Sequence, residues 1–231
     1  MKTIGLIGGV SWESSKVYYE YTNRIIRDRL GGSHSAKSML NTVDFAEIEE
    51  LTFKGNWDGI GDIIANEASK LEQSGAELIL ICSNLIHIVS ERVKEATSIP
   101  FLHIAHATGA EIKKKNLCKI ALLGTKFTME KDFYSKILED AYGLEILIPE
   151  KQERELLNEI IYKELVRGIF TEASKQRCIE IIEKLMVDGA EGVILGCTEL
   201  PLLISKSDVS IPTFDTARIH VEKAIDFALA D

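Results

Sequence analysis

Short apolar runs alternate along the chain with longer segments in which apolar residues recur every three to four positions. A short apolar run between turn residues is typical of a strand buried on both faces, and the longer period is typical of a helix. The pattern predicts strands over residues 3–9, 37–44, 100–104, 119–125 and 144–148, and two more that end at Cys82 and Cys197. It predicts helices over residues 11–30, 45–52, 58–74, 85–95, 151–167, 171–187 and 216–229. Strands that alternate with helices form parallel sheets with right-handed crossovers.

Three landmarks occur twice in the same order, about 115 residues apart. They are an apolar strand with a glycine turn, a Gly-Ala-Glu turn followed by an apolar run and a cysteine, and a Ser-Ile-Pro tripeptide. Their recurrence in one order predicts an internal duplication. We therefore expect an α/β fold of two similar small domains, each with a four-stranded parallel sheet flanked by helices. The expected domains are residues 1–97 plus 212–231, and residues 98–211.

The net charge of -9 over 231 residues leaves no basic surface suited to nucleic acid or to an anionic membrane. No segment reaches the roughly 18 apolar residues of a membrane span, and no cleavage site follows the first strand. We therefore expect a cytoplasmic protein. The four cysteines are too few for a disulfide framework, and no histidine lies at the short spacing of a zinc site, so no metal is expected.

Cys82 and Cys197 each end a predicted strand and are followed by polar residues. Open α/β sheets bind their ligands at the carboxyl ends of strands. A thiol, with a pKa of about 8.5, can serve as acid or base near neutrality, and a helix that starts just after it favours the thiolate. A thiolate and a thiol on opposite faces of a substrate carbon could invert a stereocentre. Cys118 and Cys178 fit ordinary structural roles instead.

Glycine turns after two of the strands add capacity to bind an anion. Residues 8–11 and 124–128 offer backbone N–H groups and hydroxyls suited to a small carboxylate or phosphate. Neither turn matches a phosphate-binding loop or a dinucleotide fingerprint, so the sequence predicts no nucleotide cofactor.

The motifs at these places resemble the aspartate/glutamate racemase family, whose members racemise amino acids without pyridoxal phosphate. The resemblance covers essentially the whole chain. Its motifs are Gly8-Gly9-Val10-Ser11-Trp12-Glu13-Ser14, Cys82-x-Asn84 with His87, Leu123-Gly124-Thr125, and Gly196-Cys197-Thr198-Glu199. The glutamate at position 199 resembles the motif of aspartate racemases, since glutamate racemases typically have a histidine at this position. The resemblance implies two domains around the site, Cys82 and Cys197 as the two bases, no cofactor, and a homodimer.

The resemblance also implies which residues hold the substrate. Four would bind its α-carboxylate and α-ammonium groups: Ser11, Asn84, Thr125 and Thr198. Leu85 departs from the family's first motif, taken as Cys-x-Asn-Thr, so that only a backbone N–H remains at this position. The distal carboxylate needs a cation, and Arg167 resembles a basic position of some aspartate racemases, with a solvated charge at a helix end as the alternative. Glu199 could modulate Cys197, because a nearby carboxylate raises the pKa of a thiol.

We therefore predict a cofactor-independent racemase of an acidic amino acid, with aspartate as the first candidate. One alternative is a racemase of glutamate or of a broader range of amino acids. Another is a related cysteine-dependent reaction such as hydantoin racemisation, arylmalonate decarboxylation or maleate isomerisation. An alternative outside the enzymes is a non-catalytic protein with two lobes that binds an acidic metabolite, and Leu85 supports this alternative. A thiol redox role lacks a neighbouring resolving cysteine.

Overall fold

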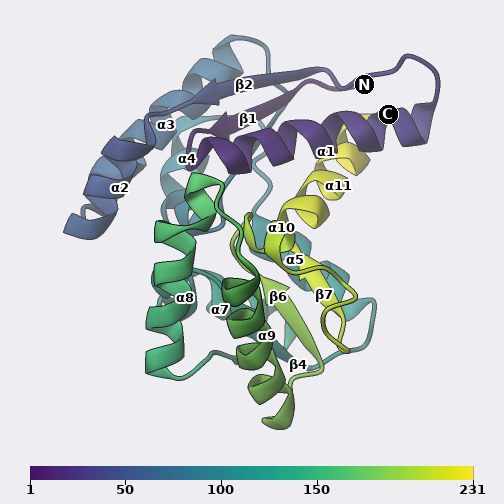
Figure 1. Ribbon diagram of the computed structural model, residues 1–231. Coiled ribbons are helices and arrows are strands. Elements are labelled where there is room, and N and C mark those ends of the chain that lie inside the picture. Colours follow the sequence, from purple (N-terminus) through teal and green to yellow (C-terminus); the bar gives the residue numbers. More distant parts are fainter. Residues whose placement is uncertain (231) are drawn as a thin grey trace. The chain divides into compact units, whose positions relative to one another are not determined.

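The computed structural model describes residues 1–230 and divides into two compact units (Figure 1). Residues 1–103 and the segment from His220 onward form unit 1, and residues 104–219 form unit 2. The sequence placed the domain borders near residues 97 and 212, a few residues earlier in each case. Those borders, and the duplication behind them, stay predictions.

Unit 1 is built on a three-stranded parallel sheet with the strand order β2-β1-β3. The strands are β1 (Ile4–Gly8), β2 (Ser38–Thr42) and β3 (Leu78–Ile81). Its helices are α1 (Trp12–Leu30), α2 (Phe45–Lys54), α3 (Trp57–Gln73), the 3₁₀ helix η1 (Leu85–Val89) and α4 (Ser90–Ala96). The expected fourth strand over 100–104 is wrong, since Phe101 forms only an isolated bridge with Ile79. Pro100 has no N–H for a ladder, and a helix begins at Ile104, so too little chain remains for a strand.

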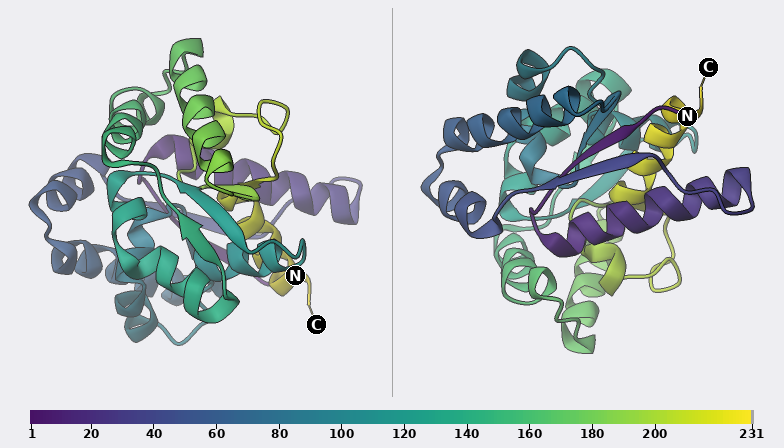
Figure 2. Two further views of the ribbon diagram at one scale, coloured as in Figure 1. Left: turned by 90° about the horizontal axis from the view of Figure 1, so that it is seen from below. Right: turned by 90° about the horizontal axis from the view of Figure 1, so that it is seen from above.

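Helices pack closely on both faces of β1. A side chain at Gly8 would collide with Ser15 of α1, at 2.5 Å from its Oγ, and one at Gly5 would meet Leu71 of α3 at 3.3 Å. Gly5 and Gly8 face opposite sides of the strand, so α1 and α3 lie on opposite faces of the sheet (Figure 2). This sandwich holds the carboxyl end of β1 in place.

Unit 2 has the expected four-stranded parallel sheet, in the order β5-β4-β6-β7. The strands are β4 (Lys119–Leu123), β5 (Glu145–Leu147), β6 (Gly192–Leu195) and β7 (Thr213–Asp215). Ala121 and Leu123 pack with α8 (Lys151–Lys163) and α9 (Glu172–Val187). Ile120 and Leu122 pack with α5 (Ile104–Lys113) and α7 (Asp132–Tyr142). The sheet is therefore buried on both faces, as its continuous apolar strands predicted.

Four helices of unit 2 were not predicted from the sequence: α5, α6 (Lys126–Glu130), α7 and α10 (Leu200–Leu203). The first of these begins in a segment that was taken for a strand. The remaining elements are η2 (Leu165–Arg167) and α11 (Thr216–Leu229), which matches its predicted range. Among the helices of residues 1–230, none combines the length and the apolar character needed to cross a membrane.

The two Gly-Ala-Glu turns have the same local geometry in the two units. Gly75 and Gly189 have left-handed φ angles of 98° and 99°, which glycine adopts readily. In both units the backbone N–H of the glutamate in this turn donates over 2.8 Å to a carbonyl where the neighbouring strand begins, from Glu77 to Thr3 just before β1 and from Glu191 to Lys119 of β4. The strands β3 and β6 are therefore entered in the same way.

Candidate active site

The carboxyl end of β6 presents Cys197 directly after a position where only glycine fits. The Gly196 N–H donates to the Leu123 carbonyl over 2.6 Å, and a Cβ at Gly196 would lie 2.7 Å from that same oxygen. The Leu123 backbone cannot move aside for a Cβ at this position as a flexible side chain could. The strand is therefore held against β4 through Gly196, and Cys197 is the first residue to leave the ladder, with 8% of its surface exposed.

A buried carboxylate holds the Cys197 thiol. The Cys197 Sγ donates to Glu199 Oε2 over 3.0 Å, and the Thr198 hydroxyl donates to the same oxygen over 2.8 Å. Glu199 is only 3% exposed. The three consecutive residues thus form one hydrogen-bonded group in which a carboxylate stands ready to accept the thiol proton.

Burial raises the pKa of the Cys197 thiol well above its ordinary value, and the negative charge of Glu199 raises it further. The backbone N–H groups of Glu199 and Leu200 act in the opposite direction, as the sequence analysis anticipated for the start of a helix. Burial and the Glu199 charge act more strongly than these donors, so the pKa of the Cys197 thiol is raised overall.

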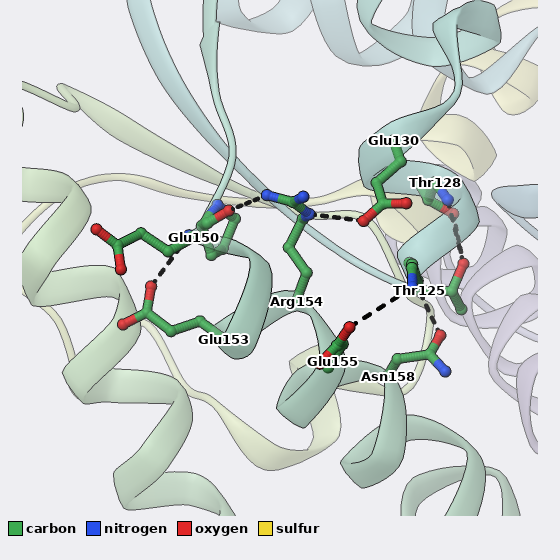
Figure 3. Close-up of polar contacts among 10 residues, drawn as sticks. Thr125, Thr128, Glu130, Glu150, Glu153, Arg154, Glu155 and Asn158 are labelled. Carbon is green, nitrogen blue, oxygen red and sulfur yellow. Dashed lines mark hydrogen bonds and ion pairs between the residues drawn. The ribbon is translucent and has the colours of Figure 1, made fainter.

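Several hydrogen-bonding groups of the turn after β4 are already bonded to other groups of the protein (Figure 3). Thr125 caps α6, with its Oγ1 accepting the Thr128 N–H over 3.2 Å. The Lys126 N–H donates to Asn158 Oδ1 of α8 over 2.9 Å. Two of the donors predicted to bind an anion at residues 124–128 are therefore already used. The Thr125 hydroxyl also lies 3.0 Å from that of Thr128, and either can donate.

Arg154 ties α8 to this turn from the other side (Figure 3). Its guanidinium donates to Glu130 Oε1 at the end of α6 over 2.8 Å and to the Pro149 carbonyl over 2.7 Å. Because α8 supplies both Arg154 and Asn158, it fixes the position of Thr125. Neither residue was predicted from the sequence, in which only their one-turn spacing on a predicted helix indicates a shared face.

Arg167, the predicted partner for a distal carboxylate, ends η2 and is exposed. Its guanidinium makes no ion pair or hydrogen bond with the part of the chain that the structure describes. Leu165, two residues earlier, is fully buried in the same apolar cluster as Cys197. Gly168 ends the segment in a left-handed conformation, which glycine adopts readily at a helix end. Arg167 is therefore a free charge on an anchored turn.

In unit 1, the glycine turn after β1 leads into α1 at Ser11. The Gly9 N–H donates to the Ser15 hydroxyl over 2.8 Å, and Ser15 donates to the Ser11 carbonyl over 3.0 Å. A side chain at Gly9 would lie 2.1 Å from the Val43 carbonyl, so the turn packs tightly on the end of β2. Ser11 is buried at the N-cap position of α1.

Cys82, Ser83 and Asn84 follow β3 and are all buried, as is Leu85 at the start of η1. The Cys82 N–H donates to the Ile7 carbonyl over 2.8 Å, and the Ser14 hydroxyl donates to the Cys82 carbonyl. Burial alone raises the pKa of the Cys82 thiol far above its ordinary value.

Cys82 and Cys197 do not occupy equivalent places, contrary to the sequence-based expectation. Ile7 and Leu123 pair with the last residues of β3 and β6, and their carbonyls accept the next N–H in each strand. That next residue is Cys82 in unit 1 and Gly196 in unit 2. The motifs aligned Cys82 with Cys197 directly. An alignment that starts from the Gly-Ala-Glu turns before them instead places Cys82 opposite Gly196, one residue earlier.

Three histidines, which the sequence analysis treated separately, form a buried cluster in unit 1. The ring centroid of His87 lies 4.6 Å from that of His103 and 5.5 Å from that of His220. The His87 Nδ1 donates to the Ser83 carbonyl over 2.7 Å, which fixes the tautomer of a neutral ring. Burial, with repulsion from the other two rings, lowers the pKa of His87 well below its usual value. The cluster thereby anchors the segment that follows Cys82.

The other two cysteines lie apart from these sites, since Cys118 is exposed and Cys178 is buried within α9. Among residues 1–230, no group of three or more histidine, cysteine, aspartate or glutamate side chains is arranged to hold a metal ion.

Comparison with known proteins places the chain in a family of racemases. The sequence model of the family described as Asp/Glu/hydantoin racemase matches residues 7–224. A structure from Yersinia pestis assigned as an Asp/Glu racemase is 45% identical, with a TM-score of 0.92 and full coverage of both chains. An aspartate racemase homologue from Pyrococcus horikoshii is 40% identical, with a TM-score of 0.87 and full coverage of both. The broad-specificity amino-acid racemase of Bacillus subtilis is 28% identical over 175 residues, 75% of this chain and 74% of its own.

Proposed function

The chain belongs to the Asp/Glu/hydantoin racemase family, which confirms the resemblance of its motifs, and from this premise we propose that it racemises an acidic amino acid without a cofactor. Aspartate is the first substrate to test. The observation that carries the proposal is the buried contact of 3.0 Å between the Cys197 thiol and the Glu199 carboxylate. In this contact the Cys197 thiol is a group suited to remove an α-proton, and the Glu199 carboxylate can accept the proton of the thiol.

The proposed reaction begins with transfer of the thiol proton of Cys197 to Glu199. The resulting thiolate removes the α-proton of the substrate and becomes a thiol again, while the electron pair stays on the α-carbon. A second group then donates a proton to the opposite face of that carbon, which inverts it. The sequence-based proposal assigns this second role to Cys82, at the carboxyl end of β3.

Hydrogen-bonding capacity supports two of the substrate-binding roles proposed for individual residues, those of Thr198 and Arg167. The Thr198 hydroxyl donates to Glu199 and keeps lone pairs for the α-ammonium group. Ser11, Asn84 and Thr125 stay proposed partners of the α-carboxylate and α-ammonium groups, and Leu85 offers only its backbone N–H. Arg167, with no partner among the described residues, is suited to the distal carboxylate by its planar pair of donors.

Two observations support different substrate ranges. The 40% identical relative is named as an aspartate racemase homologue, whereas the 28% identical relative is named as a broad-specificity racemase. The second name favours a wider range of amino acids as an alternative. Arg167 is the feature that separates the two proposals, because a free cation at the site would favour acidic side chains over neutral ones.

Proton NMR in D₂O tests the function directly. Purified, reduced protein is incubated separately with both enantiomers of aspartate, glutamate and a set of neutral amino acids, without added cofactor. We expect loss of the α-proton signal together with the appearance of the opposite enantiomer, fastest for an acidic substrate. Binding of these compounds without exchange or inversion would instead favour a non-catalytic binding protein, and turnover of hydantoins, arylmalonates or maleate would favour a related reaction. The homodimer stays a prediction, tested by light scattering.

A further inference from the structure

We propose that Ser83, rather than Cys82, is the acid/base group of unit 1. This inference deepens the proposed racemase function and rests on it. The hydroxyl of Ser83 would donate a proton to the face of the α-carbon opposite Cys197, so that the reaction uses one thiol and one hydroxyl in place of two thiols.

The hydrogen-bond register of the two sheets carries the inference. In unit 1, the ladder between β1 and β3 ends with the Cys82 N–H bonded to Ile7, and Ser83 is the first residue beyond it. In unit 2, the ladder between β4 and β6 ends with the Gly196 N–H bonded to Leu123, and Cys197 is the first residue beyond it. Since successive side chains of a strand face opposite sides, a shift of one residue changes which way a side chain points.

The sequence contains the same alignment once the turns are matched. Gly75 and Gly189, which begin the two Gly-Ala-Glu turns, stand 114 positions apart, and so do Ser83 and Cys197. Both glycines share one left-handed conformation, so no residue is gained or lost at the entry to either strand. Cys82 is therefore matched with Gly196.

Burial separates Ser83 from Cys82 in the same way. Ser83 is 7% exposed, close to the 8% of Cys197, whereas Cys82 is 1% exposed. Burial also raises the pKa of the Cys82 thiol, with no nearby donor to oppose the shift. Cys82 thus has the properties of a core residue, and Ser83 those of a residue at the edge of a binding site.

Ser83 is held by its backbone and keeps its side chain available. Its carbonyl accepts from His87 Nδ1 over 2.7 Å, which fixes the position of the residue. Its hydroxyl makes no hydrogen bond with the residues that the structure describes. A hydroxyl that is fixed at its base and has no internal partner can turn toward a bound ligand.

A hydroxyl and a thiol differ in one kinetic property. A serine hydroxyl can give a proton to a carbanion, and its alkoxide then takes one from water, while the Cys197 thiol returns its proton to solvent through Glu199. In the reverse direction Ser83 must first lose its proton to solvent, which is rare near neutrality. The enantiomer whose α-proton faces Cys197 should therefore exchange that proton with D₂O faster than it inverts, and its mirror image should not. The racemisation equilibrium itself stays at unity.

The test measures α-proton exchange and inversion separately for each enantiomer of the best substrate. In the wild-type protein, we expect exchange to exceed inversion by about tenfold or more for one enantiomer only. Ser83→Ala should lower inversion by about a hundredfold while this one-sided exchange persists. Ser83→Cys should raise inversion and bring the exchange of the two enantiomers close to each other. Cys82→Ser should keep the wild-type ratio, and Cys118→Ser serves as a matched control for the loss of a thiol.

The opposite results would overturn the proposal. They are loss of inversion in Cys82→Ser together with wild-type inversion in Ser83→Ala, in proteins with unchanged thermal unfolding. Ser83→Cys keeps the side-chain shape and guards against a folding artefact in Ser83→Ala. A wild-type protein that neither exchanges nor inverts any substrate would instead contradict the racemase function itself.

Discussion

Glu199 and Cys197 form a thiol–carboxylate pair of 3.0 Å within a segment of three residues, and the carboxylate is 3% exposed. Their closeness is local in sequence, whereas their burial is a product of the packing of α10 and the β6 strand end. A carboxylate in water would be a weak partner for a thiol. Here it both raises the pKa of the thiol and offers the nearest acceptor for its proton.

Replacement of Glu199 by glutamine tests both effects at once. Glu199→Gln keeps the size of the side chain but removes the charge and the proton acceptor. We expect racemisation to fall by about 10²–10⁴-fold, while alkylation of Cys197 begins at a lower pH because the negative charge no longer raises its pKa. The measurements are the pH–rate profile and the pH dependence of iodoacetamide labelling. Glu191→Gln, at the other end of the sheet, is the matched control, and an unchanged pH–rate profile in Glu199→Gln would contradict the role.

Arg167→Ala tests the proposed contact with the distal carboxylate. Because the guanidinium makes no internal contact, the melting temperature should stay at the wild-type value. The KM for an acidic substrate should rise about tenfold or more, as expected for the loss of a charge-assisted hydrogen bond. Arg167→Lys should be intermediate, since it keeps the charge without the paired donors. Arg177→Ala removes another exposed arginine of the same unit, and equal kinetics in the two alanine variants would exclude the contact.

Asn158→Ala tests the support that α8 gives to the Thr125 turn. The change leaves the Lys126 N–H without its acceptor, which costs about 1 kcal/mol of unfolding free energy, and it should raise KM by loosening Thr125. Asn158→Asp keeps an acceptor oxygen and should keep most of the stability. Urea unfolding and steady-state kinetics measure the two effects. Full stability in Asn158→Ala would mean that water replaces the side chain.

The buried His220 predicts a loss of stability in acid. Tyr18 donates to its Nδ1 at 2.9 Å, its Nε2 donates to the Leu102 carbonyl at 2.8 Å, and burial lowers the pKa of the ring to about 4. In the unfolded chain the same ring is protonated below a pH of about 6.5. The neutral ring therefore contributes fully to the free energy of unfolding above that pH. This contribution is lost as the pH falls toward 4, by up to about 3 kcal/mol.

Urea unfolding between pH 4 and 8 measures this loss. The lowered pKa of His87 acts in the same direction, and the rings of Tyr18 and His87 face His220. His220→Gln should therefore flatten the dependence only in part. His34→Gln, which removes an exposed histidine of the same unit, should leave the slope unchanged. A wild-type slope in His220→Gln would assign the acid sensitivity to other groups.

Local patterns determined much of this protein. The apolar runs predicted six of the seven strands, helices such as α1 and α11 were predicted at their observed ranges, and the polar residues at strand ends predicted where a site would lie. Each of these features depends on neighbours within a few residues, so the chain reveals them without any knowledge of its fold. The motifs also indicated the family, which the comparisons confirm.

Tertiary structure decided the rest, because packing and register depend on residues far apart in the chain. Pro100 and the helix that starts at Ile104 reduced a predicted strand to one bridge, and three separate histidines met in one buried cluster. Burial raised the pKa of both the Cys82 and the Cys197 thiols. Above all, the bonds from Ile7 and Leu123 show that Ser83, and not Cys82, stands where Cys197 stands, since a pairing between strands sets the face of every side chain that follows.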